Sequence, residues 1–368
     1  MAVEPATEEP AAPADAGTGF RPEEVGLATR NHGMPLEALR YEITPPGLHY
    51  LLIHFDVPAV DADAWRLEVG GTVDRPLSLS LQDLRAREPE SWTVTLECAG
   101  NGRALLQPRP VSQPWGQEAV GTATWTGVPL RSLLDEAGPA PGAREVVFAG
   151  LDRGVDGGIE QDYARSLSMA DAAGPGVLLA YGMNGAPLPP QHGFPLRLVV
   201  PGWYGMASVK WLRSVTVVDT PFLGYQTARA YRVRQVEEED GVPLSRIQPR
   251  ALMEPPGIPD FLTRERFVAP GTSTVRGRAW SGWGPVERVE VSEDGGATWA
   301  DAELGEAPGP AAWRPWSFEW HATEGARVLC CRATDAAGNV QPLEAPWNLG
   351  GYANNSVQRV PVTVRPPA

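Results

Sequence analysis

Glycine and proline are frequent from one end of this sequence to the other, and they restrict the chain to a fold of short elements and many turns. There are 40 glycines and 38 prolines among 368 residues, and they follow no fixed period. Short alternating or wholly apolar segments lie between them, for example at 92–96 and 145–149, and this pattern predicts β-strands. A helix is expected at 130–137, where a Gly-Pro pair would end it. The first part of the chain is therefore predicted to be an α+β domain.

A run of acidic residues at 237–241 marks a change of pattern, and we predict that it is a solvated linker. The sequence beyond it predicts short strands separated by turns, at 273–280, 286–292, 316–320, 327–334 and 357–364. This spacing is typical of an immunoglobulin-like sandwich. The predicted organisation is a disordered tail at 1–19, the α+β domain at 20–235 and the all-β sandwich at 236–368.

The charge balance of the chain restricts the classes of partner that it is expected to bind. With 31 basic and 45 acidic residues the formal net charge is −14, which disfavours binding to nucleic acid or to an anionic membrane surface. No stretch of about 18 apolar residues is present, so we expect no membrane span. The N-terminus has neither a basic start nor an apolar core, which predicts a cytoplasmic protein, or a periplasmic one if an export signal has been removed.

One of the three cysteines has a setting that points to chemistry. Cys330 and Cys331 are adjacent and are expected to pack in the sandwich, since three cysteines make no disulfide framework. Cys98 follows a predicted strand and precedes the small residues Ala-Gly-Asn-Gly. Arg103 is expected to lower the pKa of the thiol and to hold an anion. From these residues alone, a thiolate ligand for a transition metal and a buried core cysteine are supported equally.

The run Cys-Ala-Gly-Asn-x-Arg at 98–103 resembles the cofactor loop of the sulfite oxidase family. Further segments resemble that family in the same order along the chain, at 115–130, 150–152, 178–197, 201–205 and 209–212. Together they cover most of residues 43–231, and the predicted sandwich is similar to the family's dimerisation domain. The resemblance implies a sulfite-oxidase-like molybdopterin-binding domain followed by an immunoglobulin-like dimerisation domain.

The resemblance also implies roles for individual residues. Cys98 would bind molybdenum, next to the dithiolene of a pterin. A pterin phosphate requires fixed cations, and the resemblance supplies them in Arg197 and in Lys210, the only lysine of the chain. His54, Asp152 and His192 would complete the cofactor site. The catalytic set would comprise Cys98, Arg103, Trp115 and Tyr231, with Tyr225 as the alternative tyrosine if the loop is shifted.

The substrate-binding part of the family pattern is incomplete. Leu52 and Gly350 stand where the resemblance implies arginines, and Val111 stands where it implies a lysine. The family motif at Leu52 is Arg-Asn-His, and the same run occurs at 30–32, which is 22 residues too early. The alternative is that this earlier run folds into the pocket and supplies the missing arginine. Each charge-assisted contact to an anion contributes about 1.5–3 kcal/mol, so these losses would weaken the binding of sulfite.

The resemblance implies a homodimeric oxidoreductase that converts sulfite, a small anionic substrate, into sulfate. Electrons would pass to cytochrome c or oxygen, and no haem is expected on this chain because it has no Cys-x-x-Cys-His motif. One alternative keeps the molybdenum cofactor but acts on another sulfur oxyacid, a sulfoxide or a small organic molecule. A second alternative is a non-catalytic protein that binds the cofactor.

Overall fold

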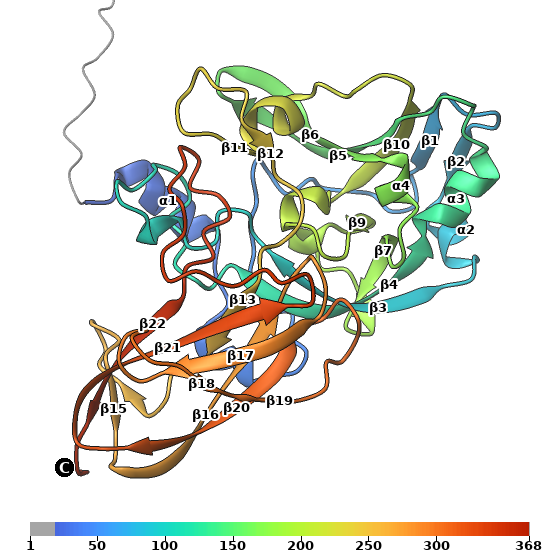
Figure 1. Cartoon of the computed structure of the whole chain (residues 1–368). Helices are drawn as coiled ribbons and strands as arrows, with labels where there is room; N and C mark the ends of the chain where they lie inside the picture. Colours follow the sequence, from blue (N-terminus) through green and yellow to red (C-terminus); the bar gives the residue numbers. More distant parts are fainter. Residues whose placement is uncertain (1–18, 368) are drawn as a thin grey trace, which may run out of the picture.

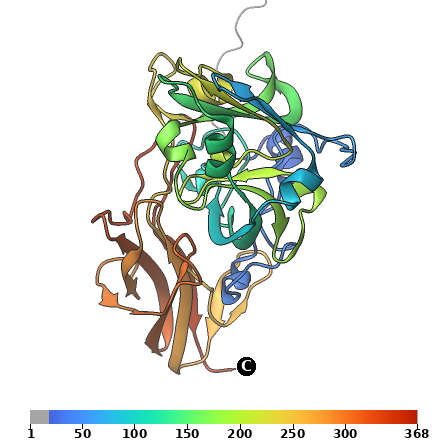
Figure 2. The same cartoon turned by 90° about the vertical axis from the view of Figure 1, so that its right-hand side faces the viewer.

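The computed structural model describes residues 19–367 and has two parts (Figures 1 and 2). The predicted disordered tail falls almost wholly on residues 1–18, outside the described range. The N-terminal part carries two sheets and four short helices, and the C-terminal part is a β-sandwich, orange to red in Figure 1. The predicted fold class, α+β followed by all-β, is confirmed.

Two twisted sheets form the frame of the N-terminal domain. One has the order β2-β1-β10-β5-β6, in which only β1 and β10 are parallel. Its strands span Leu77–Leu79, Leu67–Gly71, Leu212–Val218, Glu145–Asp156 and Ile159–Ser168. The other has the order β3-β4-β7-β8, with β9 also paired to β7. These strands span Glu90–Glu97, Val120–Pro129, Leu178–Met183, Ala186–Pro187 and Arg197–Val199.

The helices are short and lie around the sheets. They are α1 (Pro22–Arg30), α2 (Leu81–Arg85), α3 (Leu130–Ala137) and α4 (Met169–Ala172). The predicted helix is α3, which buries Leu130, Leu133 and Leu134 on one face. It ends where Gly138 adopts a left-handed conformation, with φ of 67°, as a helix C-terminus favours. No helix among residues 19–367 is long and apolar enough to cross a membrane.

The C-terminal domain is a two-sheet sandwich. One sheet has the order β13-β16-β20-β19, with strands at Arg250–Met253, Gly271–Trp280, Arg314–Ala322 and Glu303–Leu304. The other has the order β14-β15-β22-β21-β17-β18, with strands at Ile258–Pro259, Arg266–Val268, Gln358–Val364, Gly325–Asp335, Val286–Ser292 and Ala300–Asp301. Trp320, Leu329 and Cys331 are fully buried in its core. Cys330 is also fully buried and free, so both cysteines pack as predicted.

Among the contacts that join the domains, two connections bear directly on the predicted site. The hairpin β11–β12 (Arg232–Val233 and Val242–Pro243) spans the predicted boundary at 235/236, and where the domains divide stays a prediction. The second connection is the segment 348–356 between β21 and β22, called the return loop below. Its Ala353 N–H donates to the carbonyl of Ala99 at 2.8 Å, and its Asn354 Nδ2 donates to the carbonyl of Gly102 at 2.6 Å. The C-terminal domain therefore reaches back onto the Cys98 loop.

Candidate active site

The Cys98 loop is fixed by its own polar side chains. Strand β3 ends at Glu97 and delivers Cys98 to the interior, where its side chain is 6% exposed. Asn101 Nδ2 donates to Glu97 Oε1 at 3.0 Å, and Asn101 Oδ1 accepts from the N–H of Ala119. Burial raises the pKa of the Cys98 thiol, and this effect outweighs the opposing influence of Arg103. Arg103 does lower the pKa of the thiol, as predicted, but the sequence did not reveal how deeply the sulfur is buried, and burial decides the net direction.

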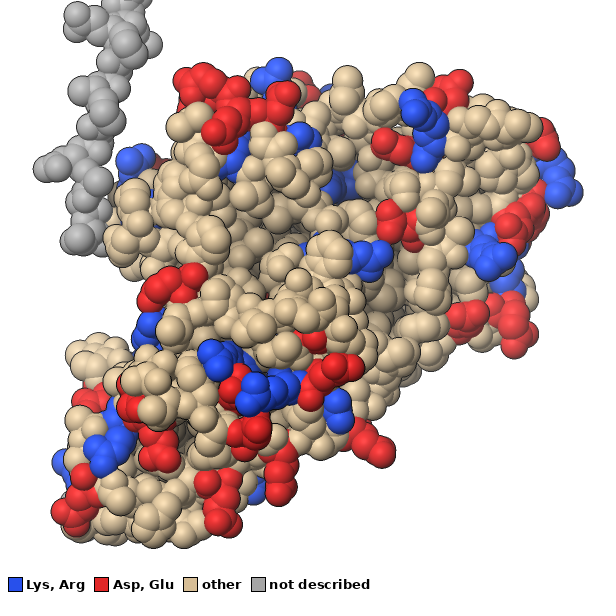
Figure 3. Space-filling view, in the orientation of Figure 1, with Lys and Arg blue, Asp and Glu red and all other residues tan. Residues whose placement is uncertain are grey.

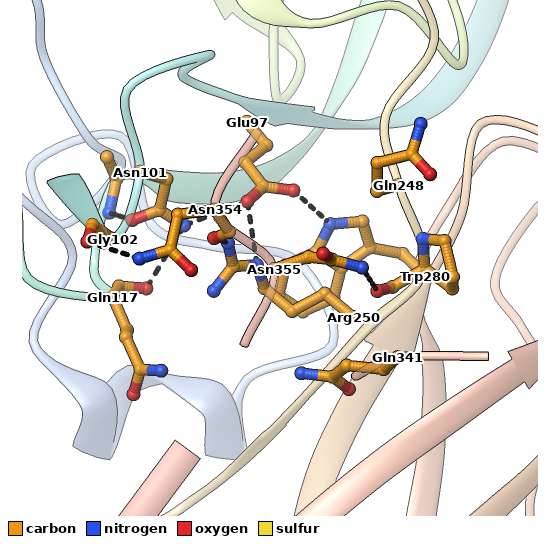
Figure 4. A network of polar contacts seen from close by, with 12 residues as sticks. Glu97, Asn101, Gly102, Gln117, Gln248, Arg250, Trp280, Gln341, Asn354 and Asn355 are labelled. Carbon is orange, nitrogen blue, oxygen red and sulfur yellow. Dashed lines mark hydrogen bonds and ion pairs between the residues drawn. The ribbon is translucent and has the colours of Figure 1, made fainter. Parts of the chain in front are cut away.

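A buried polar network supports the loop from the C-terminal domain (Figure 4). Glu97 forms an ion pair with Arg250 at 2.8 Å, and each side chain is only 1% exposed. Glu97 Oε2 also accepts from Trp280 Nε1 at 2.7 Å, while Arg250 donates to the carbonyl of Asn354. The residue directly before Cys98 is thus held by β13, β16 and the return loop.

Two adjoining cavities meet at Cys98. The inner cavity lies beneath the loop and contains the side chains predicted to bind the cofactor: His54, Cys98, Asp152, His192, Arg197, Lys210 and also Tyr231. The outer cavity, called the vestibule below, is lined by Cys98, His54 and Tyr231 together with Arg103 and Trp115. All nine predicted site residues therefore line one or both of the two cavities.

Lys210 is anchored at the wall of the inner cavity. Its Nζ donates to the carbonyls of Leu52 at 2.7 Å and Gln191 at 3.2 Å. Burial lowers the pKa of Lys210 to about 7, and the nearby Arg197 contributes to the shift. The next residue, Trp211, is fully buried with a φ of 49°, a conformation that costs a residue with a side chain about 1–3 kcal/mol. Such strain is characteristic of functional sites, and here it lies directly beside the lysine.

Arg197 and His192 form the next part of the wall. Arg197 is buried and donates to the carbonyls of His192 and Ser208, both at 3.1 Å, with its guanidinium 4.7 Å from the ring centre of Trp125. Burial lowers the pKa of Arg197 to about 10. Burial, together with the neighbouring His49, lowers the pKa of His192 to about 2, so its imidazole is neutral. The wall therefore holds fixed cations and a neutral imidazole.

Asp152 Oδ1 and His49 Nε2, two buried polar atoms that line the inner cavity, lack hydrogen-bond partners among residues 19–367. Burial raises the pKa of Asp152 to about 7. The Trp115 indole favours the ionised form of Cys98, as a donor facing the sulfur would. Unsatisfied buried polar groups are costly, so these two atoms in the wall of the inner cavity favour a bound ligand with its own donors and acceptors. Nearby cations and a single thiol complete a donor set that fits a molybdenum–pterin cofactor.

Tyr231 and His54 form a close pair at the junction of the cavities. Tyr231 Oη lies 2.6 Å from His54 Nε2, and the tyrosine is 6% exposed. Burial lowers the pKa of His54 to about 3 and holds that of Tyr231 well above its ordinary value, so both groups are neutral near pH 7. Tyr225, the alternative tyrosine, lies in the vestibule and points its hydroxyl toward Asp156 at 3.4 Å.

The structure shows what surrounds the positions that depart from the family pattern. Leu52 lines both cavities. Gly350 lies in the vestibule, and its carbonyl accepts from Arg103 Nε at 2.8 Å. Val111 is 50% exposed and lines neither cavity. No side chain at these three positions supplies a cation to the site.

The upstream Arg-Asn-His run lies beside the site but does not supply the missing charge. His32 pairs with Leu51 through their backbones, and the side chain of Asn31 lines the vestibule and bonds Gln113 at 3.0 Å. Arg30, however, forms an ion pair with the exposed Asp56 at 3.1 Å and does not line the vestibule. The alternative in which this run replaces the arginine is therefore not what the structure shows.

Sequence reasoning missed four side chains around the site: His49, Tyr163, Arg165 and Tyr352. Tyr163 and Arg165 occupy alternate, buried positions of β6, and an arginine on the buried face of an alternating strand was a usable signal. Tyr352 gave no such signal, because its position depends on where the return loop packs.

The comparisons with known proteins agree with this geometry. Residues 54–226 match the model of the oxidoreductase molybdopterin binding domain, and residues 260–365 match the Mo-co oxidoreductase dimerisation domain. Sulfite oxidase of Gallus gallus is 40% identical over 96% of this chain and 82% of its own length. Nitrate reductase [NAD(P)H] of Hordeum vulgare is 35% identical, but the chain spans only 44% of its length. The solved structure of the sulfane dehydrogenase SoxCD from Paracoccus pantotrophus superimposes with a TM-score of 0.78 at 25% identity, covering 99% of this chain and 97% of that one.

This chain belongs to the sulfite oxidase family of molybdopterin-dependent oxidoreductases, and it is an oxidoreductase. The family prediction from the Cys98 loop is confirmed. The chain spans 62% of the mitochondrial sulfite oxidase of Macaca fascicularis, to which it is 40% identical. These relatives act on different substrates by name, so they do not fix the substrate of this chain.

Proposed function

We propose that this chain oxidises a sulfur oxyacid, with sulfite as its simplest member, and passes the electrons to a separate acceptor such as cytochrome c or oxygen. The observation that carries the proposal is the convergence of Cys98, the fixed cations and the Tyr231–His54 pair on two adjoining cavities. Retention of all these groups argues against the non-catalytic alternative.

The residues present would hold the cofactor in a consistent way. Cys98 would supply the thiolate, since coordination to a metal deprotonates even a buried thiol. Lys210 and Arg197 are the cations suited to the pterin phosphate, and Asp152 is suited to accept from N–H groups of the pterin. When bound, this cofactor supplies two-electron redox chemistry with transfer of an oxygen atom.

The chain's own chemistry lies on the vestibule side of Cys98. Two of the Arg103 nitrogens donate to the carbonyls of Gly350 and Gln113, and these bonds leave Nη2 available to an anion. The neutral His54 and Tyr231 share a hydrogen bond, which holds a proton at Tyr231 Oη where the two cavities meet. Trp115 adds a buried indole that excludes water beside the thiol. These residues would orient the substrate and control one proton.

A homodimer is part of the proposal, supported by the match to the dimerisation domain. The hairpin β14–β15 in that domain exposes Phe261 and Leu262, each at 84%. Sedimentation of the purified protein should give the mass of two chains. A single-chain mass that is independent of concentration would contradict the dimer.

Metal analysis and a steady-state assay test the proposal. The purified protein should contain about one molybdenum per chain, and Cys98→Ser should lose it, whereas Cys330→Ser, in the distant sandwich, should keep it. The loaded enzyme should reduce ferricyanide or cytochrome c when sulfite or another sulfur oxyacid is supplied. Absence of molybdenum, or a loaded enzyme that oxidises no sulfur oxyacid, would contradict the proposal.

A further inference from the structure

Tyr352 fills the space in which the family pattern implies an arginine. Gly350 has no side chain, and a Cβ placed on it would overlap the ring of Tyr352. The ring is held there by a turn: the N–H of Tyr352 donates to Asn348 Oδ1 at 2.9 Å, and Asn348 Nδ2 donates to the carbonyl of Tyr352 at 2.8 Å. A side chain at position 350 and the ring of Tyr352 in this place are therefore incompatible.

The ring of Tyr352 alters the anion site itself. Its centre lies 5.1 Å from the guanidinium carbon of Arg103 and 5.3 Å from the ring centre of Tyr231. It therefore covers one face of the retained arginine with an aromatic surface. Leu52, at the other position where the pattern implies an arginine, also lines the vestibule, so an aliphatic side chain and an aromatic ring face the space where two guanidinium groups are implied.

The entrance to this site is not strongly cationic. Besides Arg103, the vestibule is lined by three arginines and by five carboxylates, namely Arg229, Arg232, Arg234, Asp156, Glu237, Glu238, Glu239 and Asp240. The predicted linker thus forms part of the rim, and acidic side chains gather over the β11–β12 region in Figure 3. Arg232 and Arg234 donate to carbonyls of the same acidic loop. This entrance would not concentrate a dianion.

We propose that the substrate is a small organic sulfinate, R–SO₂⁻. A sulfinate keeps the sulfur lone pair of sulfite and carries one negative charge, which matches Arg103, the one arginine retained where the family pattern implies cations for the substrate. It replaces the third oxygen with a hydrocarbon group, which would pack against Leu52 and Tyr352. This inference rests on the proposed function and names its substrate class.

The reaction balances with the same external acceptor. One S–O bond forms and the C–S bond is kept, as R–SO₂⁻ and water give R–SO₃⁻, two protons and two electrons. The sulfinate is oxidised, and two equivalents of a one-electron acceptor such as ferricyanide are reduced. Tyr352 is then a specificity-determining residue that favours the organic substituent.

Substrate preference gives the first test. With ferricyanide as acceptor, kcat/KM for benzenesulfinate should exceed that for sulfite by at least about tenfold, equivalent to about 1.4 kcal/mol. Tyr352→Ala should reduce this ratio about tenfold, whereas Tyr352→Phe should keep it because the ring remains. Leu52→Arg should shift the ratio toward sulfite, and Val111→Lys, at an exposed site, should leave it unchanged.

Binding of product analogues gives a second readout that does not depend on turnover. Isothermal titration of the molybdenum-loaded enzyme should show benzenesulfonate binding about tenfold tighter than sulfate, and Tyr352→Ala should remove the difference. Preference for sulfite and sulfate, unchanged in Tyr352→Ala, would overturn the sulfinate inference while leaving the proposed function intact. A loaded enzyme that oxidises neither substrate would instead overturn the proposed function.

Discussion

The inner cavity and the vestibule share Cys98 but follow the family pattern to different extents. The inner cavity keeps the full predicted set, including Asp152, Arg197 and Lys210, and its cations are fixed by backbone carbonyls. The vestibule has Leu52 and Tyr352 in place of charge. The substrate side of the site can therefore depart from the family pattern while the cofactor side keeps it, although Leu52, His54, Cys98 and Tyr231 line both cavities.

Arg250→Met tests whether the inner cavity depends on the C-terminal domain. The substitution leaves Glu97 buried without its partner, so the free energy of unfolding should fall by about 3–5 kcal/mol in denaturant titration. The molybdenum content should fall with it, because Glu97 adjoins Cys98. Arg359→Met, which breaks an exposed pair with Glu344, should cost less than about 1 kcal/mol. Equal losses in the two variants would show that the buried pair has no special role.

Asp152→Asn tests whether the inner cavity is built for a bound ligand. In cofactor-free protein the pKa of Asp152 is raised to about 7, so the contribution of its protonated form to stability is complete below about pH 4 and is lost as the pH rises to 7. The free energy of unfolding therefore declines as the pH rises, and Asp152→Asn should remove about 2–4 kcal/mol of this decline. Urea unfolding at several pH values measures it. Asp135→Asn, at an exposed position, should leave the dependence of stability on pH unchanged. If wild type and both variants show the same dependence, Asp152 is not the group responsible.

Tyr231→Phe tests the chemistry where the cavities meet. Removal of the hydroxyl that bonds His54 should lower kcat about 100-fold at unchanged molybdenum content, since a positioned proton donor or acceptor contributes about 10²–10⁴-fold. Tyr225→Phe, in the vestibule, should stay close to the wild-type rate. A larger loss of kcat in Tyr225→Phe than in Tyr231→Phe would show that Tyr225 is the active-site tyrosine.

Arg30→Met tests whether the upstream arginine contributes to the vestibule, and its expected effect on stability and KM is the smallest. Its ion pair with Asp56 is exposed, so stability should change by less than about 1 kcal/mol and KM should not change. Arg103→Met, in contrast, should raise KM at least about tenfold, because it removes the retained cation beside Cys98. A raised KM in Arg30→Met would show that the upstream arginine does reach the substrate.

Sequence reasoning identified what local patterns encode. The α3 helix and the sandwich strands followed from the spacing of apolar and turn residues, whereas the convergence of His54, His192 and Lys210 followed from the resemblance to the family. The lowering of the Cys98 pKa by Arg103 was predicted, but the larger opposing effect of burial was not, because burial depends on the whole fold. Arg250 and Tyr352 were missed for a related reason: their partners lie far away in sequence, and nothing local marks them.

The return loop has a consequence for how the enzyme is made. Asn354, which bonds Gly102, follows it by 252 residues, and at about 5–20 residues per second the ribosome needs roughly 10–50 s to span that distance. Cys98 is synthesised before this interval begins and Lys210 is added within it, so both precede the outer wall formed by the return loop. The nascent chain thus passes through a stage in which the return loop does not yet cover the cavity. A bulky prosthetic group that enters at this stage is not obstructed by Tyr352.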